Sequence, residues 1–170
     1  MIDTVRIIIS LDCNLSCSYC CNEIPEVRNR FARKALDEIN FSGYQNVVIT
    51  GGEPFYRKDV LFRVLRRIPP EKTIYMNTNG MLITDNDIEL LRQYSIKGIT
   101  IGLHAIMQPK QLNPRLEMFF PVRYNVDIEY RDWFLKLWPG ILTEENLRGY
   151  ELNKCDMPNE DWILLDEDHH

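Results

Sequence analysis

Three cysteines stand close together near the start of the chain, in the run Cys13-Asn-Leu-Ser-Cys17-Ser-Tyr-Cys20. The run follows an apolar, strand-like segment, Val5–Leu11, so the thiols gather on one tight loop. Three is one short of the four protein thiolates that an iron–sulfur cluster normally takes. A [4Fe–4S] cluster on Cys13, Cys17 and Cys20 would keep one iron open to a small molecule. The loop therefore indicates a protein that carries out a chemical reaction.

Two more segments with unusual composition follow predicted strands. One is Thr50-Gly51-Gly52-Glu53-Pro54, and the other is Asn77-Thr78-Asn79-Gly80. In parallel α/β folds the carboxyl ends of the strands are where sites assemble. Taken alone, the first segment is as consistent with a tight turn as with a site, and the Asn-Gly of the second favours a turn.

Short β-rich runs recur along the chain, with helical patterns between them. The predicted strands are Val5–Leu11, Asn46–Thr50, Thr73–Asn77, Gly98–Leu103, Val122–Glu129 and Trp162–Leu165. The predicted helices are Arg28–Phe41, Lys58–Ile68, one that follows an N-cap at Thr84, and one over Tyr130–Trp138 that Pro139-Gly140 stops.

This alternation predicts right-handed βαβ units around a parallel sheet. Pro109 and Pro114 allow only a short helix between residues 108 and 118. Six strands are too few for a complete eight-unit barrel, which takes about 250 residues. We therefore expect an α/β fold in one domain over residues 1–170: a partial (βα)6 TIM-like barrel, open, with a mostly parallel sheet and outer helices.

The composition is that of an ordinary globular protein, with 170 residues, 45% hydrophobic and 26% charged, and a formal net charge of −5. Charges of both signs alternate, so nucleic-acid binding is not indicated. The chain contains no apolar run of 18 residues, so we expect no membrane span, and the amino terminus lacks a signal-peptide pattern. Four of the five cysteines lie within nine residues, which suits a metal site in a reducing compartment and a cytoplasmic protein.

Together, the three segments resemble the radical S-adenosylmethionine (SAM) superfamily. Its cluster loop has the pattern Cys-x3-Cys-x-aromatic-Cys, which Cys13, Cys17, Tyr19 and Cys20 fill. Its Gly-Gly-Glu-Pro motif is present as Gly51 to Pro54. The segment at 77–80 is similar to the third-strand segment of members with molybdopterin-type or peptide-modifying chemistry. The resemblance covers roughly residues 5 to 130.

The resemblance implies a [4Fe–4S] cluster on Cys13, Cys17 and Cys20 whose fourth iron is chelated by the amino and carboxylate groups of SAM. An electron from the reduced cluster would break the sulfur–carbon bond, and the 5′-deoxyadenosyl radical would abstract hydrogen from a substrate. The electron would come from a donor such as flavodoxin or ferredoxin. The cofactor does the bond breaking, while the protein positions and encloses it.

The resemblance also places other residues around SAM. Tyr19 would lie near the adenine, and Asn77 and Asn79 would lie near the sulfonium, the ribose or the substrate. Three consecutive residues of the second motif would line the methionine amino group, largely through their backbone: Gly51, Gly52 and Glu53.

His104 departs from the family's pattern. Members often carry Ser-x-Asp at the end of the fourth strand, near the ribose, where this chain has Ile101-Gly102-Leu103-His104. The side chain would reach the ribose, bind substrate or transfer a proton, but a histidine at a strand end is more often a hydrogen-bonded structural residue.

The predicted fifth strand alternates sharply between apolar and polar residues. Its apolar face is Val122, Tyr124, Val126 and Ile128, and its polar row is Arg123, Asn125, Asp127 and Glu129. We expect the polar row to line the lumen, with Asn125 near the adenosine of the cofactor. The alternative is an edge strand whose polar side faces water.

The remaining cysteines carry less information. Cys21 directly follows a predicted ligand and is interpreted as a packed thiol. Cys155 stands alone, and one cysteine cannot supply an auxiliary cluster. The tail from Leu142 to Asp168 helps to select the substrate or completes the sheet.

These patterns favour a radical SAM enzyme that acts on its own small-molecule, nucleotide or peptide substrate. The alternative is an activase that makes a glycyl radical on a partner protein. A remote alternative is a non-catalytic zinc module, for which three spaced cysteines with no nearby histidine make a poor tetrahedral set.

Overall fold

One parallel sheet runs through the protein. The computed structural model describes residues 1–17, 20, 24–104, 107–151 and 159–166. Within these residues, eight strands pair in the order β2-β8-β1-β3-β4-β5-β6-β7, and every pairing is parallel. The strands are β1 (Thr4–Ile8), β2 (Phe31–Lys34), β3 (Asn46–Thr50), β4 (Thr73–Thr78), β5 (Ile96–Gly102), β6 (Val122–Asp127), β7 (Leu147–Tyr150) and β8 (Asp161–Leu165). The open, parallel α/β sheet confirms the predicted fold class.

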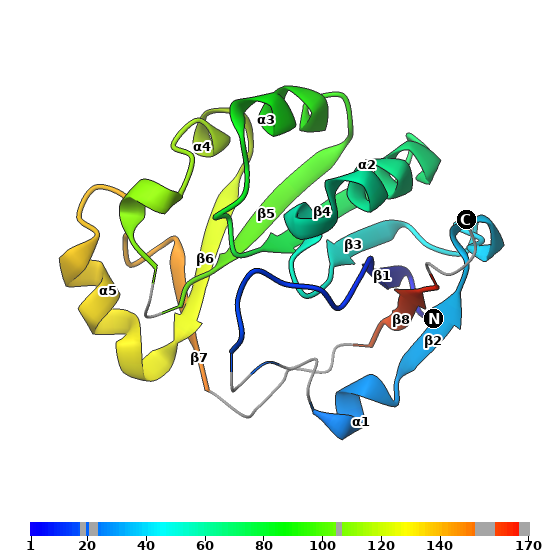
Figure 1. Cartoon of the computed structure of the whole chain (residues 1–170), viewed down its shortest axis with the longest axis horizontal. Coiled ribbons are helices and arrows are strands. Elements are labelled where there is room, and N and C mark those ends of the chain that lie inside the picture. Colours follow the sequence, from blue (N-terminus) through cyan, green and yellow to red (C-terminus); the bar gives the residue numbers. More distant parts are fainter. Residues whose placement is uncertain (18–19, 21–23, 105–106, 152–158, 167–170) are drawn as a thin grey trace.

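The helices lie mainly along one side of this sheet (Figure 1). They are α1 (Pro25–Arg28), α2 (Lys58–Arg67), α3 (Asp85–Leu91), α4 (Leu116–Phe119) and α5 (Arg131–Leu137), with 3₁₀ turns η2 (Leu36–Glu38), η3 (Pro54–Arg57), η4 (Pro109–Gln111) and η5 (Ile128–Tyr130). The predicted helices at 58–68, after Thr84, and at 130–138 are confirmed as α2, α3 and α5.

The register separates the sheet into two faces. Ile7, Ile49 and Met76 share the outer face, where they pack in one core with Leu61 of α2 and Ile88 of α3. The alternate positions of the same strands form the inner face, which those two helices do not cover. A smaller apolar cluster on the inner face joins Ile8, Trp162 and Leu164 to Val27 of α1 and so covers only the β1–β8–β2 end.

The predicted helix over Arg28–Phe41 is wrong. That segment contains the short strand β2 and the turn η2. Phe31 pairs in register with Trp162 of β8, and the two rings lie 5.8 Å apart. Pairing with a strand from the far end of the chain overrides the local helical pattern, as tertiary contacts often override propensity. The sheet therefore has two strands, β2 and β7, that the sequence pattern did not predict.

The predicted fifth strand is β6, and it is an interior strand. It pairs with β5 on one side and β7 on the other, so the edge-strand alternative is wrong. Tyr124 and Val126 are buried on the outer face, as predicted. The alternation ends earlier than expected, because Asp127 is buried and accepts the Glu129 N–H at 3.3 Å as the cap of η5. Ile128 then stays 54% exposed.

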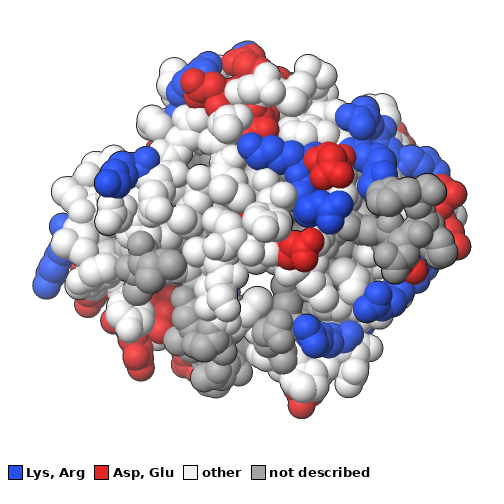
Figure 2. All heavy atoms as spheres, in the orientation of Figure 1, with Lys and Arg blue, Asp and Glu red and all other residues white. Residues whose placement is uncertain are grey.

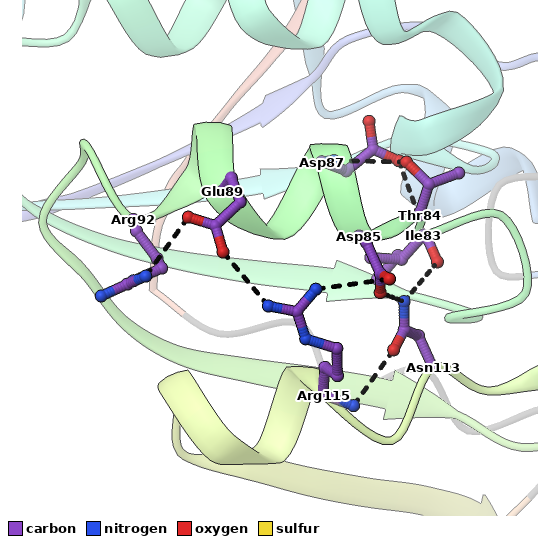
Figure 3. Close-up of polar contacts among 8 residues, drawn as sticks. All are labelled: Ile83, Thr84, Asp85, Asp87, Glu89, Arg92, Asn113 and Arg115. Atoms are coloured by element: carbon purple, nitrogen blue, oxygen red, sulfur yellow. Dashed lines mark hydrogen bonds and ion pairs between the residues drawn. The ribbon is translucent and has the colours of Figure 1, made fainter.

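A polar network fastens the irregular β5–β6 connection to α3 (Figure 3). Asn113 donates to Asp85 Oδ1 at 2.8 Å, and Arg115 forms ion pairs with Asp85 and Glu89 at 3.3 Å each. Pro109 and Pro114 prevent a long helix in this connection, and these contacts attach it to α3. Arg115 is the centre of the network.

On the face seen in Figure 2, Lys and Arg side chains gather toward the upper right, where Figure 1 shows α2, with acidic side chains among and beside them, and the middle of the face is largely uncharged. Among the described residues, no helix has the length and hydropathy that a membrane span requires.

We predict that Thr84→Ala destabilises the protein by about 1 kcal/mol, the usual cost of losing an N-cap. The Thr84 hydroxyl accepts the Asp87 N–H at 3.2 Å, and the Asp87 carboxylate accepts the Thr84 N–H at 2.8 Å. Urea unfolding measures the effect, and Asn86→Ala, an exposed change in the same first turn, is the matched control. Equal stability of the two variants would contradict the capping role.

Candidate radical SAM site

The carboxyl ends of the parallel strands bring the three sequence segments together. The cysteine loop leaves β1, the Gly-Gly-Glu-Pro segment leaves β3, and the Asn-Thr-Asn-Gly segment ends β4. Figure 1 draws the chain after β1 in dark blue as it turns away from the sheet. Neighbouring parallel strands therefore position all three segments at one edge.

The base of the cysteine loop continues the β1–β3 pairing beyond the strands. Ile9 donates to the Thr50 carbonyl at 3.0 Å, and Gly52 donates to the Ser10 carbonyl at 2.8 Å. Glu53 then donates to the Asp12 carbonyl at 2.8 Å. Backbone hydrogen bonds thus carry the register up to the residue before Cys13, which fixes where the loop begins.

Gly51 and Gly52 are required by this close backbone approach. A Cβ on Gly51 would lie 2.8 Å from the Ser10 carbonyl oxygen. A Cβ on Gly52 would lie 2.3 Å from the carbonyl oxygen of Asp12 and 2.5 Å from that of Leu11. Backbone atoms cannot move aside as a flexible side chain can, so any side chain at Gly52 would force the Leu11–Asp12 backbone to shift.

Glu53 is buried beneath the loops and uses its carboxylate inside the protein. It is 1% exposed. Its Oε1 accepts the Thr78 hydroxyl at 2.5 Å and the Phe55 N–H at 3.1 Å, while Oε2 accepts the Asn79 N–H at 2.7 Å. Burial raises the pKa of this carboxyl, and the three donors oppose that shift. Its side chain therefore joins β3 to β4, and only its backbone is left to face a ligand.

Asn79 connects β4 to the cysteine loop. Its amide donates to Asn14 Oδ1 at 2.8 Å, and its own oxygen accepts the Met81 N–H at 3.0 Å. Asn14 lies between Cys13 and Cys17 in the sequence, so this contact holds the loop over the end of β4. Sequence reasoning did not assign a role to Asn14 or Thr78; the position of Asn14 within the cysteine run was the available signal.

The three predicted ligand thiols are all partly exposed. Cys13 Sγ accepts the Leu15 N–H at 3.3 Å, and Cys20 donates its N–H to the Cys17 carbonyl at 3.2 Å in a tight turn. Burial raises the pKa of the Cys13 thiol; the Leu15 N–H opposes this, and the nearby negative charges of Glu53 and Cys20 add to it. Iron binding has to displace that proton, because thiolates are the ligands.

His104 lies beside the cysteine loop. Its Nδ1 is 3.5 Å from Cys17 Sγ. Its backbone N–H donates to Met107 Sδ at 3.3 Å, and a Cβ on Gly102 would be 3.8 Å from its Nε2. Burial lowers the pKa of the imidazole.

Asn77 of β4 and Asn125 of β6 lie on the inner face of the sheet, since their neighbours Met76, Tyr124 and Val126 are buried on the outer face. With its amide oriented to satisfy both neighbours, Asn77 accepts from Arg6 Nη1 at 2.9 Å and donates to the Met76 carbonyl at 3.3 Å. Asn125 is half-buried and in register with Gly102. Their predicted contacts with the cofactor stay predictions. Tyr19, Cys21 and Cys155 fall outside the described residues.

Fold and site together define a radical SAM protein. The family model of the radical SAM superfamily matches residues 7–119, and the chain belongs to that superfamily. Its members combine a [4Fe–4S] cluster with SAM, and the two cofactors predicted for this chain are those of the family.

Among curated relatives, a GTP 3′,8-cyclase of Rhodopirellula baltica is 34% identical over 118 residues, which cover 61% of this chain and 32% of that protein. A GTP 3′,8-cyclase of Photorhabdus laumondii is 24% identical over 88% of this chain and 48% of its own length. The chain thus spans about a third to a half of the relatives described here.

Two solved structures share the fold. The structure titled native anSMEcpe with bound AdoMet has a TM-score of 0.53 and 15% identity, and the match covers 88% of this chain and 51% of that one. The structure of BtrN in complex with AdoMet and 2-DOIA has a TM-score of 0.51 and 17% identity over 76% of this chain and 58% of that one.

The described thiols fit the family's cluster. Cys13, Cys17 and Cys20 lie on one loop whose base is held by backbone hydrogen bonds, and all three are partly exposed, so they can supply three thiolates to one cluster. Within the described residues, no group of three His, Cys, Asp or Glu side chains is placed to hold a single metal ion.

We predict that Gly52→Ala destabilises the protein by about 1–3 kcal/mol, as overpacking against fixed atoms does, and lowers the iron retained after reconstitution. The added Cβ would force the Leu11–Asp12 backbone away and shift the cysteine loop. Thermal unfolding and iron analysis measure the two effects. Gly43→Ala is the control, since a Cβ there meets nothing within 4 Å. A Gly52→Ala protein as stable and as iron-loaded as the control would disprove the packing argument.

Proposed function

We propose that this protein is an enzyme that cleaves SAM reductively at a [4Fe–4S] cluster on Cys13, Cys17 and Cys20 and removes a hydrogen atom from a substrate. The observation that supports this is the placement of the three-thiol loop at the carboxyl edge of a parallel sheet, over the buried Glu53 network. Bound there, the two cofactors supply an electron and a carbon-centred radical.

The chain's own residues position and enclose these groups. The backbone of Gly51, Gly52 and Glu53 would line the methionine end of SAM, because the Glu53 carboxylate is already occupied by three donors. Tyr19 would lie near the adenine. The half-buried Asn125 and the inner-face Asn77 would lie toward the adenosine or the substrate.

A nucleotide is the substrate that we favour among the small-molecule, nucleotide and peptide classes. Arg123 of β6 and Arg148 of β7 are both exposed. Arg148 is in register with Asn125, two residues after Arg123, so the two arginines lie on the same, inner face of neighbouring strands. Guanidinium groups on one face of a sheet suit the binding of an anionic group such as a phosphate. The relatives named above are GTP cyclases, and a triphosphate would supply such an anion.

Other functions have less support. The relatives and structures described above give no support to an activase that acts on a partner protein. An external reductant, such as flavodoxin or ferredoxin, would supply the electron. A low-potential cluster with partly exposed thiols also suits the reducing cytoplasm.

Cys17→Ala is expected to abolish the formation of 5′-deoxyadenosine from SAM under strong reductant and to lower the bound iron, because the cluster loses one of three protein ligands. Anaerobic reconstitution, iron and sulfide analysis and chromatography of the products measure this. Ser16→Ala, an exposed change in the same loop, is the control. Retained turnover with a complete cluster in Cys17→Ala would show that the ligand assignment is wrong.

Arg123→Ala is expected to weaken GTP binding to the reconstituted, SAM-loaded protein about tenfold, which equals about 1.4 kcal/mol and is the size of one charged hydrogen bond. Equilibrium dialysis gives the dissociation constants. Arg66→Ala on the exposed side of α2 removes the same charge far from the inner face. Equal losses in both variants would mean a general charge effect. A wild-type protein that binds no GTP would refute the nucleotide preference and leave SAM cleavage untouched.

A further inference from the structure

We propose that His104 donates a hydrogen bond from Nδ1 to the thiolate of Cys17 and thereby makes the cluster easier to reduce. The proposal rests on the cluster assignment above. It gives His104 a positioning and tuning role at a cluster sulfur, in place of the contact with ribose or substrate that the family pattern suggests.

The contact is direct. Nδ1 lies 3.5 Å from Cys17 Sγ, within the range of hydrogen bonds to sulfur, and both side chains are partly buried. In a free thiol either partner can donate. Once Cys17 binds iron it carries no proton, so only the imidazole N–H can donate across this contact.

Backbone contacts fix the position of His104 at the end of the sheet. Leu103 donates to the Asn125 carbonyl at 2.7 Å, which ties the end of β5 to β6. The His104 carbonyl accepts the Met107 N–H at 2.9 Å, and its own N–H donates to Met107 Sδ at 3.3 Å. The backbone is thus held on both sides of the His104 Cα, which places the imidazole next to the cysteine loop.

The position of Gly102 shows how the ring is oriented. Gly102 is two residues before His104, and a Cβ there would be in ordinary van der Waals contact with Nε2, at 3.8 Å. The imidazole therefore lies near the Gly102 backbone, with its other nitrogen toward the cysteine loop. This orientation uses Nδ1 at the sulfur and leaves Nε2 on the side of the sheet.

The chemical consequence follows from charge. Reduction adds an electron that is shared with the sulfurs, so a donor at a ligand sulfur stabilises the reduced cluster more than the oxidised one. Cys13 already receives a backbone donor from Leu15 at 3.3 Å. His104 gives Cys17 the equivalent donor from a side chain, which a mutation can remove.

The test is a redox titration of the anaerobically reconstituted full chain, followed by electron paramagnetic resonance. At a fixed potential, His104→Leu should lower the ratio of reduced to oxidised cluster about tenfold, a shift of about 59 mV for one electron. His104→Gln, whose amide still donates, should recover part of the loss. Lys110→Ala, an exposed change in the same connection, is the control and should match the wild type.

The outcomes separate the two assignments. A wild-type protein that assembles no cluster would remove the proposed function itself. A normal cluster whose potential is the same in wild type, His104→Leu and His104→Gln would overturn this inference alone. An unchanged potential with weakened SAM binding in both variants would also overturn it, because that pattern belongs to a ribose contact.

A second measurement covers the case in which His104→Leu fails to hold a cluster. Pulsed electron paramagnetic resonance of the wild-type protein, grown with ¹⁵N-histidine, should show one weakly coupled nitrogen on the reduced cluster. The signal should be absent from identically labelled His104→Gln. No coupling in the wild type, or the strong coupling of a nitrogen bound to iron, would overturn the hydrogen bond.

Discussion

The close approach of two backbone segments is the constraint on which the site depends. The chain after β1 lies against Gly52 so tightly that a methyl group would come within 2.3 Å of a carbonyl oxygen. That approach is stabilised by the Gly52 and Glu53 N–H groups, which donate to Ser10 and Asp12. Because these bonds involve only backbone, the beginning of the cysteine loop is set by the sheet itself.

The buried carboxylate of Glu53 extends this constraint to β4. It accepts from Thr78 and Asn79, and Asn79 in turn donates to Asn14 in the cysteine loop. A buried carboxylate would be costly without such donors, so the three segments stabilise one another. The conspicuous motif residues are therefore partly structural, because they position the thiol loop, and their backbone groups are the ones we propose to line SAM.

Local patterns predicted the elements whose contacts are local or repeated. The apolar stripe of α2 and the Thr84 cap of α3 are confirmed. The segment 28–41 was predicted wrongly, because β2 exists through its pairing with β8, and a single sequence carries little signal for a partner so far along the chain. In the site, the cysteine spacing predicts the cluster ligands, and that assignment stays a prediction. The Asn79–Asn14 bond and the orientation of His104 depend on neighbouring strands and could not be predicted from spacing.

The paired strands β5 and β6 carry residues proposed to act at the cluster and residues proposed to bind SAM and the substrate. Just beyond the carboxyl end of β5, His104 contacts Cys17, and its other ring nitrogen lies near Gly102. Gly102 is in register with Asn125, and Thr100 with Arg123. The β5–β6 pair thus positions three residues: His104 beside the cluster loop, Asn125, which we propose lies near SAM, and Arg123, which we propose binds the substrate. A rigid pair of strands, with Tyr124 and Ile101 buried in the core behind it, can hold a hydrogen donor close to the point where a radical forms, which is what positioning catalysis requires.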